Sequence, residues 1–236
     1  MYNPPVPPEA STGRRLLLFT KPARAGRVKT RLVGDLTAAQ AAELHAAFLA
    51  DLLDRLRAGS FALAIAWALE PGEPIPPGDL PGVRQEGEGL GERLTHALTG
   101  AGRQARAVAA LGSDHPTLPV ALVERAFAAV EAGARVVLGP AEDGGYYLIA
   151  LAVPFPRRIF EEIDWSTERV LGQTLERCRE LGITPELLPE AADVDTAEDL
   201  KRLAGRMAES GSDLGCPRTR ALLAAWNLLP HLSEVP

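Results

Sequence analysis

The stretch AVAALGSDHPTLP, residues 107–119, indicates the class of fold that the rest of the chain forms. The five apolar residues that open it are typical of a strand buried on both faces, because a half-exposed strand would alternate apolar and polar residues. Gly112 and Ser113 end this strand. Pro119 predicts the first residue of a helix, where its missing N–H leaves no hydrogen bond unmade. A buried strand that passes directly into a helix is typical of a parallel sheet covered by helices.

Similar apolar segments alternate with helical ones along most of the chain. We expect strands at 15–20, 61–67, 106–112, 134–140, 146–152 and 183–189, with a short strand, a glycine-rich loop and a helix within 83–102. Further helices are expected at 37–57, 119–132, 166–182, 196–208 and 221–229. This alternation predicts a single α/β domain with a doubly wound, mostly parallel sheet over residues 14–208. We expect a disordered tail at 1–13 and a helical tail at 209–236.

Composition excludes several classes of function. The 236 residues carry a net charge of -6, which disfavours a general nucleic-acid-binding surface. Only two cysteines occur, without metal-site spacing, as expected in a reducing compartment. No apolar run approaches the roughly 20 residues that a membrane span needs. The proline-rich start has no positively charged region, so we expect no secretory signal and a cytoplasmic protein.

Charged turns follow several of the expected strands. A basic loop follows the first strand, Asp114 follows the strand at 106–112, and the turns EDGG and DVDT come later. Because open α/β sheets bind ligands outside the carboxyl ends of their strands, we expect these turns to meet in one site.

The basic loop is suited to a diphosphate or triphosphate. Lys21, Arg24, Arg27, Lys29 and Arg31 lie within eleven residues of an otherwise acidic protein. Several cations on one loop match the charge of a polyphosphate, although the loop has neither of the common glycine-rich phosphate-binding patterns. A solvated basic turn is an equally good interpretation of the loop taken alone.

The aspartates in these turns are candidate ligands for Mg²⁺ or Mn²⁺. Mg²⁺ prefers oxygen ligands and usually takes one or two carboxylates together with phosphate oxygens. Asp114 taken alone is explained better as a turn residue or a helix cap than as a metal ligand. Thr196 is a good cap for the last long helix, so Asp195 is free to bind a metal. Asp193 is the weaker candidate, because its side chain alternates with that of Asp195 around Val194.

Two glycine-rich turns are candidate ligand contacts. GEGLGERL, residues 87–94, opens a helix and offers backbone N–H groups to a base or a phosphate. EDGG places Asp143 before Gly144 and Gly145, which would let a ligand approach the backbone closely. Ordinary tight turns explain both stretches as well, and Asp-Gly is favoured in a hairpin turn.

Five motifs together resemble a known family. LFTKPARAGRVKTRL, LGSDHPTLP, GPAEDGGYYLIAL, DWSTERVLGQTL and DVDTAEDL occur in this order. The set is similar to a bacterial family of GT-A-like proteins in the nucleotide-diphospho-sugar transferase superfamily, often described as glycosyltransferases and sometimes linked to arsenosugar synthesis. The resemblance covers residues 15–204, and the tail motif CPRTRALL is also family-like. It implies a Rossmann-like nucleotide-binding fold.

The chain is also similar to a more distant group of nucleotidyltransferases, which make molybdenum guanine dinucleotide, phospholactate guanylyl adducts and CMP-sugars. The resemblance implies that Asp114 and Asp195 bind the divalent metal. It also implies a set of nucleotide-binding residues: Lys29 and Arg31 at the phosphates with Lys21 nearby, and the segment from Gln85 through Gly89 and Gly91 to Arg93 near the base.

The chain departs from both groups at defined positions. Ser113-Asp114-His115 has one carboxylate where a typical GT-A enzyme has D-x-D, and LFTKPARAG lacks the glycines of L-x-A-G-G-x-G-x-R-M. Ala197 replaces a proline that is common in the late turn. The motifs therefore specify the superfamily more closely than the reaction.

The sequence predicts a metal-dependent transferase that uses a nucleotide-activated sugar and a small-molecule acceptor. Asp143 is the candidate base for the acceptor's proton, with Asp164 as the weaker candidate; a turn-forming role explains Asp143 equally well. The alternative is a nucleotidyltransferase that joins an NTP to a phosphorylated acceptor and releases pyrophosphate. A non-catalytic nucleotide-binding module is the third hypothesis.

Overall fold

The structure is a computed structural model of the chain and describes residues 13–229. The expected N-terminal tail, 1–13, therefore lies outside the described residues except for Gly13. The C-terminal tail, 209–236, is described as far as residue 229.

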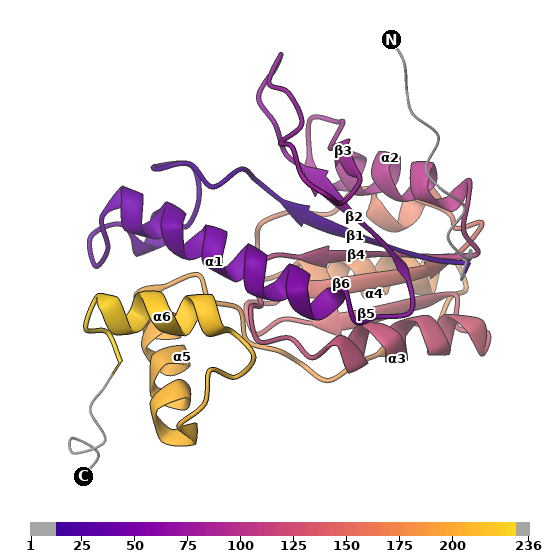
Figure 1. Cartoon of the computed structure of the whole chain (residues 1–236). Helices are drawn as coiled ribbons and strands as arrows, with labels where there is room; N and C mark the ends of the chain where they lie inside the picture. Colours follow the sequence, from indigo (N-terminus) through magenta and orange to yellow (C-terminus); the bar gives the residue numbers. More distant parts are fainter. Residues whose placement is uncertain (1–12, 230–236) are drawn as a thin grey trace.

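One seven-stranded sheet forms the centre of the molecule, with the strand order β3-β2-β1-β4-β6-β5-β7 (Figure 1). All neighbouring strands are parallel except that β6 runs antiparallel to both β4 and β5. A tight turn at 141–145 joins β5 to β6, and such a short connection requires antiparallel strands. The predicted mostly parallel α/β sheet is confirmed. The strands are β1 (Arg14–Thr20), β2 (Ala62–Trp67), β3 (Gly82–Arg84), β4 (Ala107–Gly112), β5 (Val136–Pro140), β6 (Tyr146–Ala152) and β7 (Glu186–Leu187).

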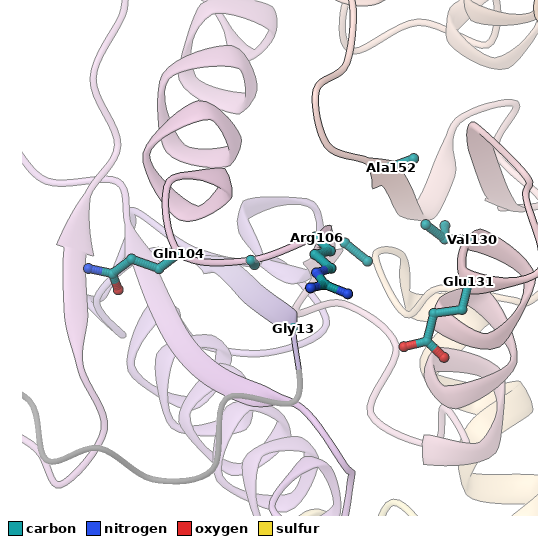
Figure 2. Close-up of a pocket in the computed structure, with 8 residues that line it drawn as sticks. Gly13, Gln104, Arg106, Val130, Glu131 and Ala152 are labelled. Atoms are coloured by element: carbon teal, nitrogen blue, oxygen red, sulfur yellow. The ribbon is translucent and has the colours of Figure 1, made fainter.

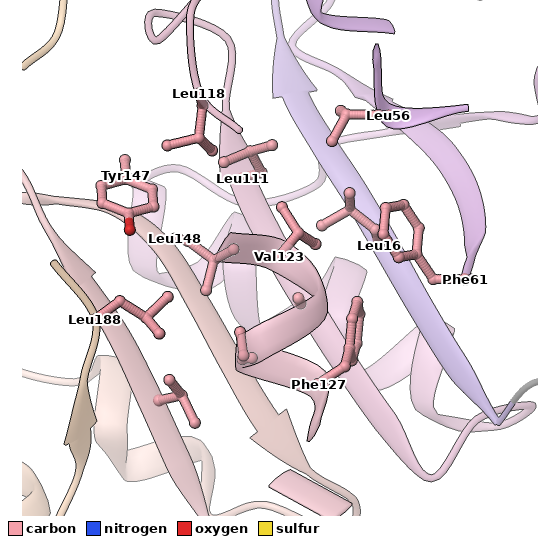
Figure 3. Packing of buried hydrophobic residues seen from close by; sticks show 14 of the residues in the cluster. Leu16, Leu56, Phe61, Leu111, Leu118, Val123, Phe127, Tyr147, Leu148 and Leu188 are labelled. Atoms are coloured by element: carbon pink, nitrogen blue, oxygen red, sulfur yellow. The ribbon is translucent and has the colours of Figure 1, made fainter. Parts of the chain in front are cut away.

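Helices cover both faces of this sheet, because successive residues of each buried strand point to opposite faces. Leu16 and Leu18 of β1 pack in one cluster with residues of α1 and α3, including Phe127 (Figure 3). Leu17 packs in a second cluster on the other face, with Leu94 of α2 and residues of α4. The helices are α1 (Ala38–Leu56), α2 (Leu90–Gly102), α3 (Val120–Glu131), α4 (Val170–Glu180), α5 (Ala197–Ser210) and α6 (Pro217–Ala225), with 3-10 turns η1 (Thr30–Leu32) and η2 (Arg157–Phe160).

Helix boundaries lie within two residues of those expected, except for the start of α4 and both ends of α6. Pro119 is the residue before α3 rather than its first residue. α4 begins at Val170 instead of at residue 166, because Ser166 has a φ of 65° and cannot continue a right-handed helix. α6 begins at Pro217 and ends at Ala225, earlier than the expected 221–229.

A third apolar cluster lies beside the sheet and joins the C-terminal helices to the basic loop. It contains residues of the loop region, α1, the DVDT turn, α5 and α6: Leu32, Leu36, Leu44, Phe48, Val194, Leu200, Leu203, Ala204, Met207, Cys216 and Leu223. Figure 1 shows α6 next to α1, and α5 next to α6, at one end of the sheet. Within residues 13–229, no helix has both the length and the apolar character needed to cross a membrane.

Candidate functional site

Three segments far apart in sequence meet beyond the carboxyl ends of β1 and β4. Lys29 follows β1, Asp114 follows β4, and Asp195 lies in the turn before α5. The amide of Val194 donates to the carbonyl oxygen of Asp114 at 3.0 Å, which joins the second and third segments directly. The predicted convergence of these turns is therefore present in the structure.

The Lys29 ammonium lies between the two carboxylates. Its Nζ donates to the Val194 carbonyl oxygen at 2.7 Å and to Asp195 Oδ1 at 3.0 Å, and it forms an ion pair with Asp114. The ammonium also lies 5.6 Å from the centroid of the buried Phe48 ring. Because an ammonium has three N–H donors, these three protein partners use all of them. Lys29 thus organises the carboxylates in this structure, and its predicted contact with a phosphate remains a prediction.

Asp114 combines an ion pair with an open carboxylate. Its side chain is 44% exposed, whereas that of Lys29 is 2% exposed. Burial of its surroundings acts to raise the pKa of Asp114, but the nearby Lys29 ammonium outweighs this and lowers the pKa below its ordinary value. The carboxylate is therefore ionised at neutral pH and accessible to a ligand from outside.

The other cations of the basic loop divide into two groups. Arg31 is 70% exposed and its Nη1 lies 3.7 Å from Asp195 Oδ2, while Lys21 is exposed at the end of β1. Arg24 and Arg27 instead form ion pairs with Glu73 and Glu70 in the proline-rich loop before β3. Arg24 and Arg27 thus pair with carboxylates of another loop, whereas Lys29 and Arg31 pair with the aspartates of the candidate site.

His45 fixes the start of the basic loop, a role that the sequence did not reveal. This buried residue of α1 places Nε2 at 3.1 Å from the Lys21 carbonyl oxygen and 3.2 Å from Thr20 Oγ1. Burial lowers the pKa of His45 below its ordinary value, so the ring is neutral at pH 7. A neutral ring that donates from Nε2 anchors the loop without adding charge to the site.

The EDGG turn lies beside the DVDT turn, because Ala141 and Ala191 form a bridge between the two segments. Burial, together with the negative charges of Asp143 and Asp195, raises the pKa of Asp193 to about 6. Asp193 therefore belongs to the same acidic edge as Asp195, although Lys29 bonds only to Asp195 of the two among the described contacts.

His115 is buried next to Asp114, with 6% of its surface exposed. Burial lowers the pKa of His115 to about 4, so it is neutral at pH 7. Its ring centroid lies 5.3 Å from that of Tyr147, whose hydroxyl donates to the Pro189 carbonyl oxygen. The residue packs behind Asp114 and leaves that carboxylate as the exposed group of the pair.

The turn-forming role of Asp143 is visible in its contacts. Its Oδ1 accepts a hydrogen bond from the Gly145 amide at 2.9 Å, and the side chain is exposed. Gly144 has a φ of 84°, and a Cβ there would lie 2.2 Å from the Glu168 carbonyl oxygen. Packing against the segment before α4 thus explains this glycine without a ligand. Among the described residues, no hydrogen bond or ion pair uses Oδ2 of Asp143, and its catalytic role remains a prediction.

Asp164 is bound within its own segment. Its Oδ2 accepts from Gln173 Nε2 at 2.7 Å and pairs with Arg169 at 3.1 Å, while the Gln173 carbonyl accepts from the Asp164 amide. These contacts fix the entry to α4, and its catalytic role remains a prediction.

The predicted residues of the glycine-rich segment before α2 also make contacts within the protein. Gln85 lies at the end of β3, where its Nε2 donates to the Ala66 carbonyl oxygen at 2.8 Å, at the same edge of the sheet as the basic loop. Gly89 is the exposed cap of α2, and Arg93 Nε donates to the Gly87 carbonyl oxygen at 3.0 Å.

Gly91 has a structural reason to be glycine. A Cβ at this position would lie 2.6 Å from the Phe160 carbonyl oxygen and 2.7 Å from the Trp165 indole nitrogen. The close packing of α2 against η2 and the segment before α4 therefore requires a residue without a side chain.

The carboxylates of Asp114 and Asp195 suit a divalent cation whose other ligands come from the phosphates of a bound nucleotide. Within residues 13–229, no group of three or more His, Cys, Asp or Glu residues is arranged to hold a metal ion. Asp114 and Asp195 offer two partly exposed carboxylates, which is the number that Mg²⁺ usually takes from a protein when phosphates complete its shell.

A cavity of about 730 Å³ lies at the opposite edge of the sheet. Its lining includes Gly13 before β1, Arg106 and Ala107 at the start of β4, and Glu131 at the end of α3 (Figure 2). The amino ends of the parallel strands β1 and β4 lie there, whereas ligands of open α/β sheets bind at the carboxyl ends. The cavity is therefore separate from the candidate site.

Comparison with known proteins identifies relatives of the chain. Residues 73–167 match a family described as uncharacterised proteins conserved in bacteria (DUF2064). A crystal structure from Desulfovibrio desulfuricans G20, described as a "putative nucleotide-diphospho-sugar transferase", is 31% identical with a TM-score of 0.82. This match covers 92% of the present chain and 96% of the relative. No curated protein matches the chain.

Other solved structures share the fold alone. A cytidylyltransferase from Leptospira borgpetersenii serovar Hardjo-bovis is 13% identical with a TM-score of 0.52, over 92% of this chain and 96% of that one. A CMP:2-keto-3-deoxy-manno-octonic acid synthetase complexed with CTP is 14% identical with a TM-score of 0.50, over 84% and 99%. From the identity and coverage of the Desulfovibrio relative and the match to the family, the chain belongs to the bacterial DUF2064 family, within the nucleotide-diphospho-sugar transferase superfamily.

Proposed function

We propose that this protein is a metal-dependent glycosyltransferase that moves a sugar from a nucleotide-activated donor to a small-molecule acceptor. The observation that carries this proposal is the convergence of Lys29, Asp114 and Asp195 beyond the carboxyl ends of the central strands. The exposed Arg31 and Lys21 lie on the same loop as Lys29. Acidic and basic groups at one edge suit a ligand with several phosphate charges and a bound cation.

The protein groups would act mainly on the charge of the departing nucleoside diphosphate. Arg31 and Lys21 would face the phosphates, because both are exposed and Arg31 lies beside Asp195, whereas Arg24 and Arg27 pair with glutamates of the loop before β3. Asp114 and Asp195 would hold Mg²⁺ or Mn²⁺, which when bound neutralises part of the diphosphate charge. Fixed charges placed where negative charge develops lower the barrier without reorganising at the moment of reaction.

Asp143 is the candidate group that takes the acceptor's proton. It is exposed, retains one oxygen outside its turn hydrogen bond, and lies at the acidic edge that includes Asp193. A carboxylate in this position would accept a proton from an acceptor hydroxyl as the sugar is transferred.

Calorimetric binding of nucleotides in the presence of Mn²⁺ tests the site. We expect Asp114→Ala and Asp195→Ala to weaken metal-dependent binding, because each removes a proposed ligand. Asp79→Ala is the matched control, since Asp79 is an exposed aspartate that pairs with Arg57 away from the site. Unchanged metal-dependent binding in both site variants would remove Asp114 and Asp195 from the site.

A nucleotidyltransferase is the second candidate, favoured by the single carboxylate in Ser113-Asp114-His115. The same cations would then serve attack at an α-phosphate. The products distinguish the two reactions: nucleoside diphosphate released from sugar nucleotides supports glycosyl transfer, and pyrophosphate released from NTPs supports nucleotidyl transfer. Tight nucleotide binding without turnover of either donor class would instead favour the non-catalytic module.

A further inference from the structure

The C-terminal segment is bound to the loop that carries Asp114, through one side chain of α1. Arg55 lies in the last turn of α1, and its Nη1 donates to the carbonyl oxygens of Pro116 at 2.6 Å and Leu118 at 3.0 Å. Its Nη2 donates to the carbonyl oxygens of Leu214 at 3.3 Å and Gly215 at 2.6 Å. One guanidinium thus joins residues that are about a hundred positions apart in the chain.

Cys216 makes a second connection between the same two segments. Its buried thiol donates to the Pro116 carbonyl oxygen at 3.0 Å, the same oxygen that Arg55 contacts. Burial raises the pKa of the Cys216 thiol, which therefore stays protonated and able to donate. A carbonyl that accepts from both a guanidinium and a thiol, two residues after Asp114, is held firmly in place.

Asp51 fixes the C-terminal segment in turn, one helical turn before Arg55. Its side chain is fully buried, and Oδ2 accepts from the Thr219 amide and hydroxyl, both at 2.8 Å, while Oδ1 accepts from the Arg218 amide at 3.1 Å. The carboxylate caps the first turn of α6, where backbone N–H groups have no partner within the helix. Figure 1 shows α6 beside α1, as these bonds require.

Glycine is needed where the segment meets Arg55. Gly215 has a φ of 74°, and a Cβ there would lie 2.8 Å from Arg55 Nη2. The chain can approach the guanidinium this closely only because position 215 has no side chain.

From these contacts we propose that Arg55 and Cys216 are positioning residues for Asp114, and that the Leu214–Cys216 segment with α6 is a structural part of the active site. The Asp114 loop is then held on two sides: Val194 binds the Asp114 carbonyl oxygen, and Arg55 with Cys216 binds the carbonyl oxygen of Pro116. The expected effect of these contacts on ligand binding rests on the proposed role of Asp114 in holding the metal and diphosphate.

The first test is hydrogen–deuterium exchange of the full chain. Arg55→Met should increase exchange in the peptide spanning 112–119, because the loop loses its bonds to the guanidinium. Arg57→Met is the matched control: Arg57 lies two residues later, is exposed, and pairs with Asp79 instead. Cys216→Ala should also increase exchange at 112–119, by a smaller amount. This variant provides the test if Arg55→Met does not fold. Unchanged exchange at 112–119 in the folded variants would overturn the proposal.

The second test measures calorimetric affinity for inorganic pyrophosphate with Mn²⁺. Arg55→Met should weaken binding by about tenfold, the lower end of the effect seen when partners of metal ligands are removed. In an Asp114→Ala background the same substitution should add little, because its effect passes through Asp114. An equal loss in both backgrounds would show that Arg55 acts by another route, and the positioning role would be wrong.

The two tests separate this inference from the proposed function. If Asp114→Ala and the unchanged protein bind Mn²⁺ and pyrophosphate equally, the proposed ligand role of Asp114 fails, and exchange at 112–119 still decides whether Arg55 holds the loop. If Asp114→Ala weakens binding and Arg55→Met alters neither exchange nor affinity, the positioning role fails and the proposed function stands.

Discussion

Lys29 combines a left-handed backbone with a buried ammonium. Its φ is 47°, a region that few non-glycine residues occupy, and its side chain is 2% exposed. Such a conformation persists where surrounding contacts over-determine it. Here the contacts are those of the ammonium with Val194, Asp114 and Asp195.

Replacing Lys29 should therefore destabilise the protein. In Lys29→Met, two neighbouring carboxylates would lose the cation between them, and we expect a loss of about 1 to 3 kcal/mol in the free energy of unfolding. Arg31→Met is the control, since an exposed pair at 3.7 Å contributes less than about 0.5 kcal/mol. Urea denaturation at pH 7 measures both, and equal stability of the two variants would contradict this account of Lys29.

A substitution at Gly91 tests whether this glycine is required for close packing of α2. Gly91→Ala would press a Cβ against the Phe160 carbonyl oxygen, and we expect a loss of about 1 to 3 kcal/mol. Gly100 lies on the same helix with open space around it, so Gly100→Ala should stabilise the protein by about 0.5 to 1 kcal/mol. Thermal unfolding of both variants gives the comparison, and a stabilising Gly91→Ala would show that the position is not crowded.

At the scale of elements, capping boxes begin the two helices next to the site. Thr37 with Gln40 begins α1, and Thr196 with Asp199 begins α5. Asp199 also accepts from the Asp195 amide at 3.1 Å and pairs with Arg202. The second capping box thus holds the DVDT turn in place as well as starting the helix.

The pH dependence of stability should report on Asp199. Burial opposes its ionisation, but hydrogen bonds from Thr196 and Arg202 prevail and lower its pKa to about 2. A carboxyl whose pKa is lower when folded stabilises the protein above its unfolded pKa, and this stabilisation is lost as pH falls toward the folded value.

We expect Asp199→Asn to lose about 2 kcal/mol at pH 7, with the difference from the unchanged protein shrinking as pH falls from about 4 to 2. Glu198→Gln is the control, because Glu198 is an exposed neighbour in the same turn. Denaturant titrations at several pH values measure the trend. A difference that stays constant with pH would assign the loss to something other than the Asp199 charge.

At the scale of the whole molecule, the C-terminal helices share a core with the basic loop. Leu223 of α6 is fully buried in the cluster that contains Leu32, three residues after Lys29, and Val194, directly before Asp195. A core substitution in α6 should therefore lower the stability of the whole fold.

Leu223→Ala tests this coupling. We expect it to lower the free energy of unfolding by about 2 to 5 kcal/mol, the usual range for a leucine removed from a packed core. Leu228 lies just after α6 and is 38% exposed, so Leu228→Ala should change stability by less than about 0.5 kcal/mol. Urea unfolding followed by fluorescence compares the two. A small effect of Leu223→Ala would mean that α6 is not part of the core.

Much of the fold could be predicted because it depends on local pattern. The apolar runs at β1 and β4 and the capping residues Thr37 and Thr196 each have a local physical cause. The predicted start of α4 at residue 166 was wrong, because the conformation of Ser166 is set by its surroundings and not by its intrinsic preference as a helix cap. The same distinction applies to the site.

The sequence by itself determined the order of strands and helices, their burial, and which charged turns follow the strands, because hydrophobic periodicity and capping are properties of neighbouring residues. Only the tertiary structure decided which charges meet. Lys29 and Asp195 are 166 positions apart, Arg24 and Arg27 are paired with glutamates of another loop, and Arg55 joins the Asp114 loop to α6. Such contacts depend on how distant segments pack, and no local pattern in the chain encodes them.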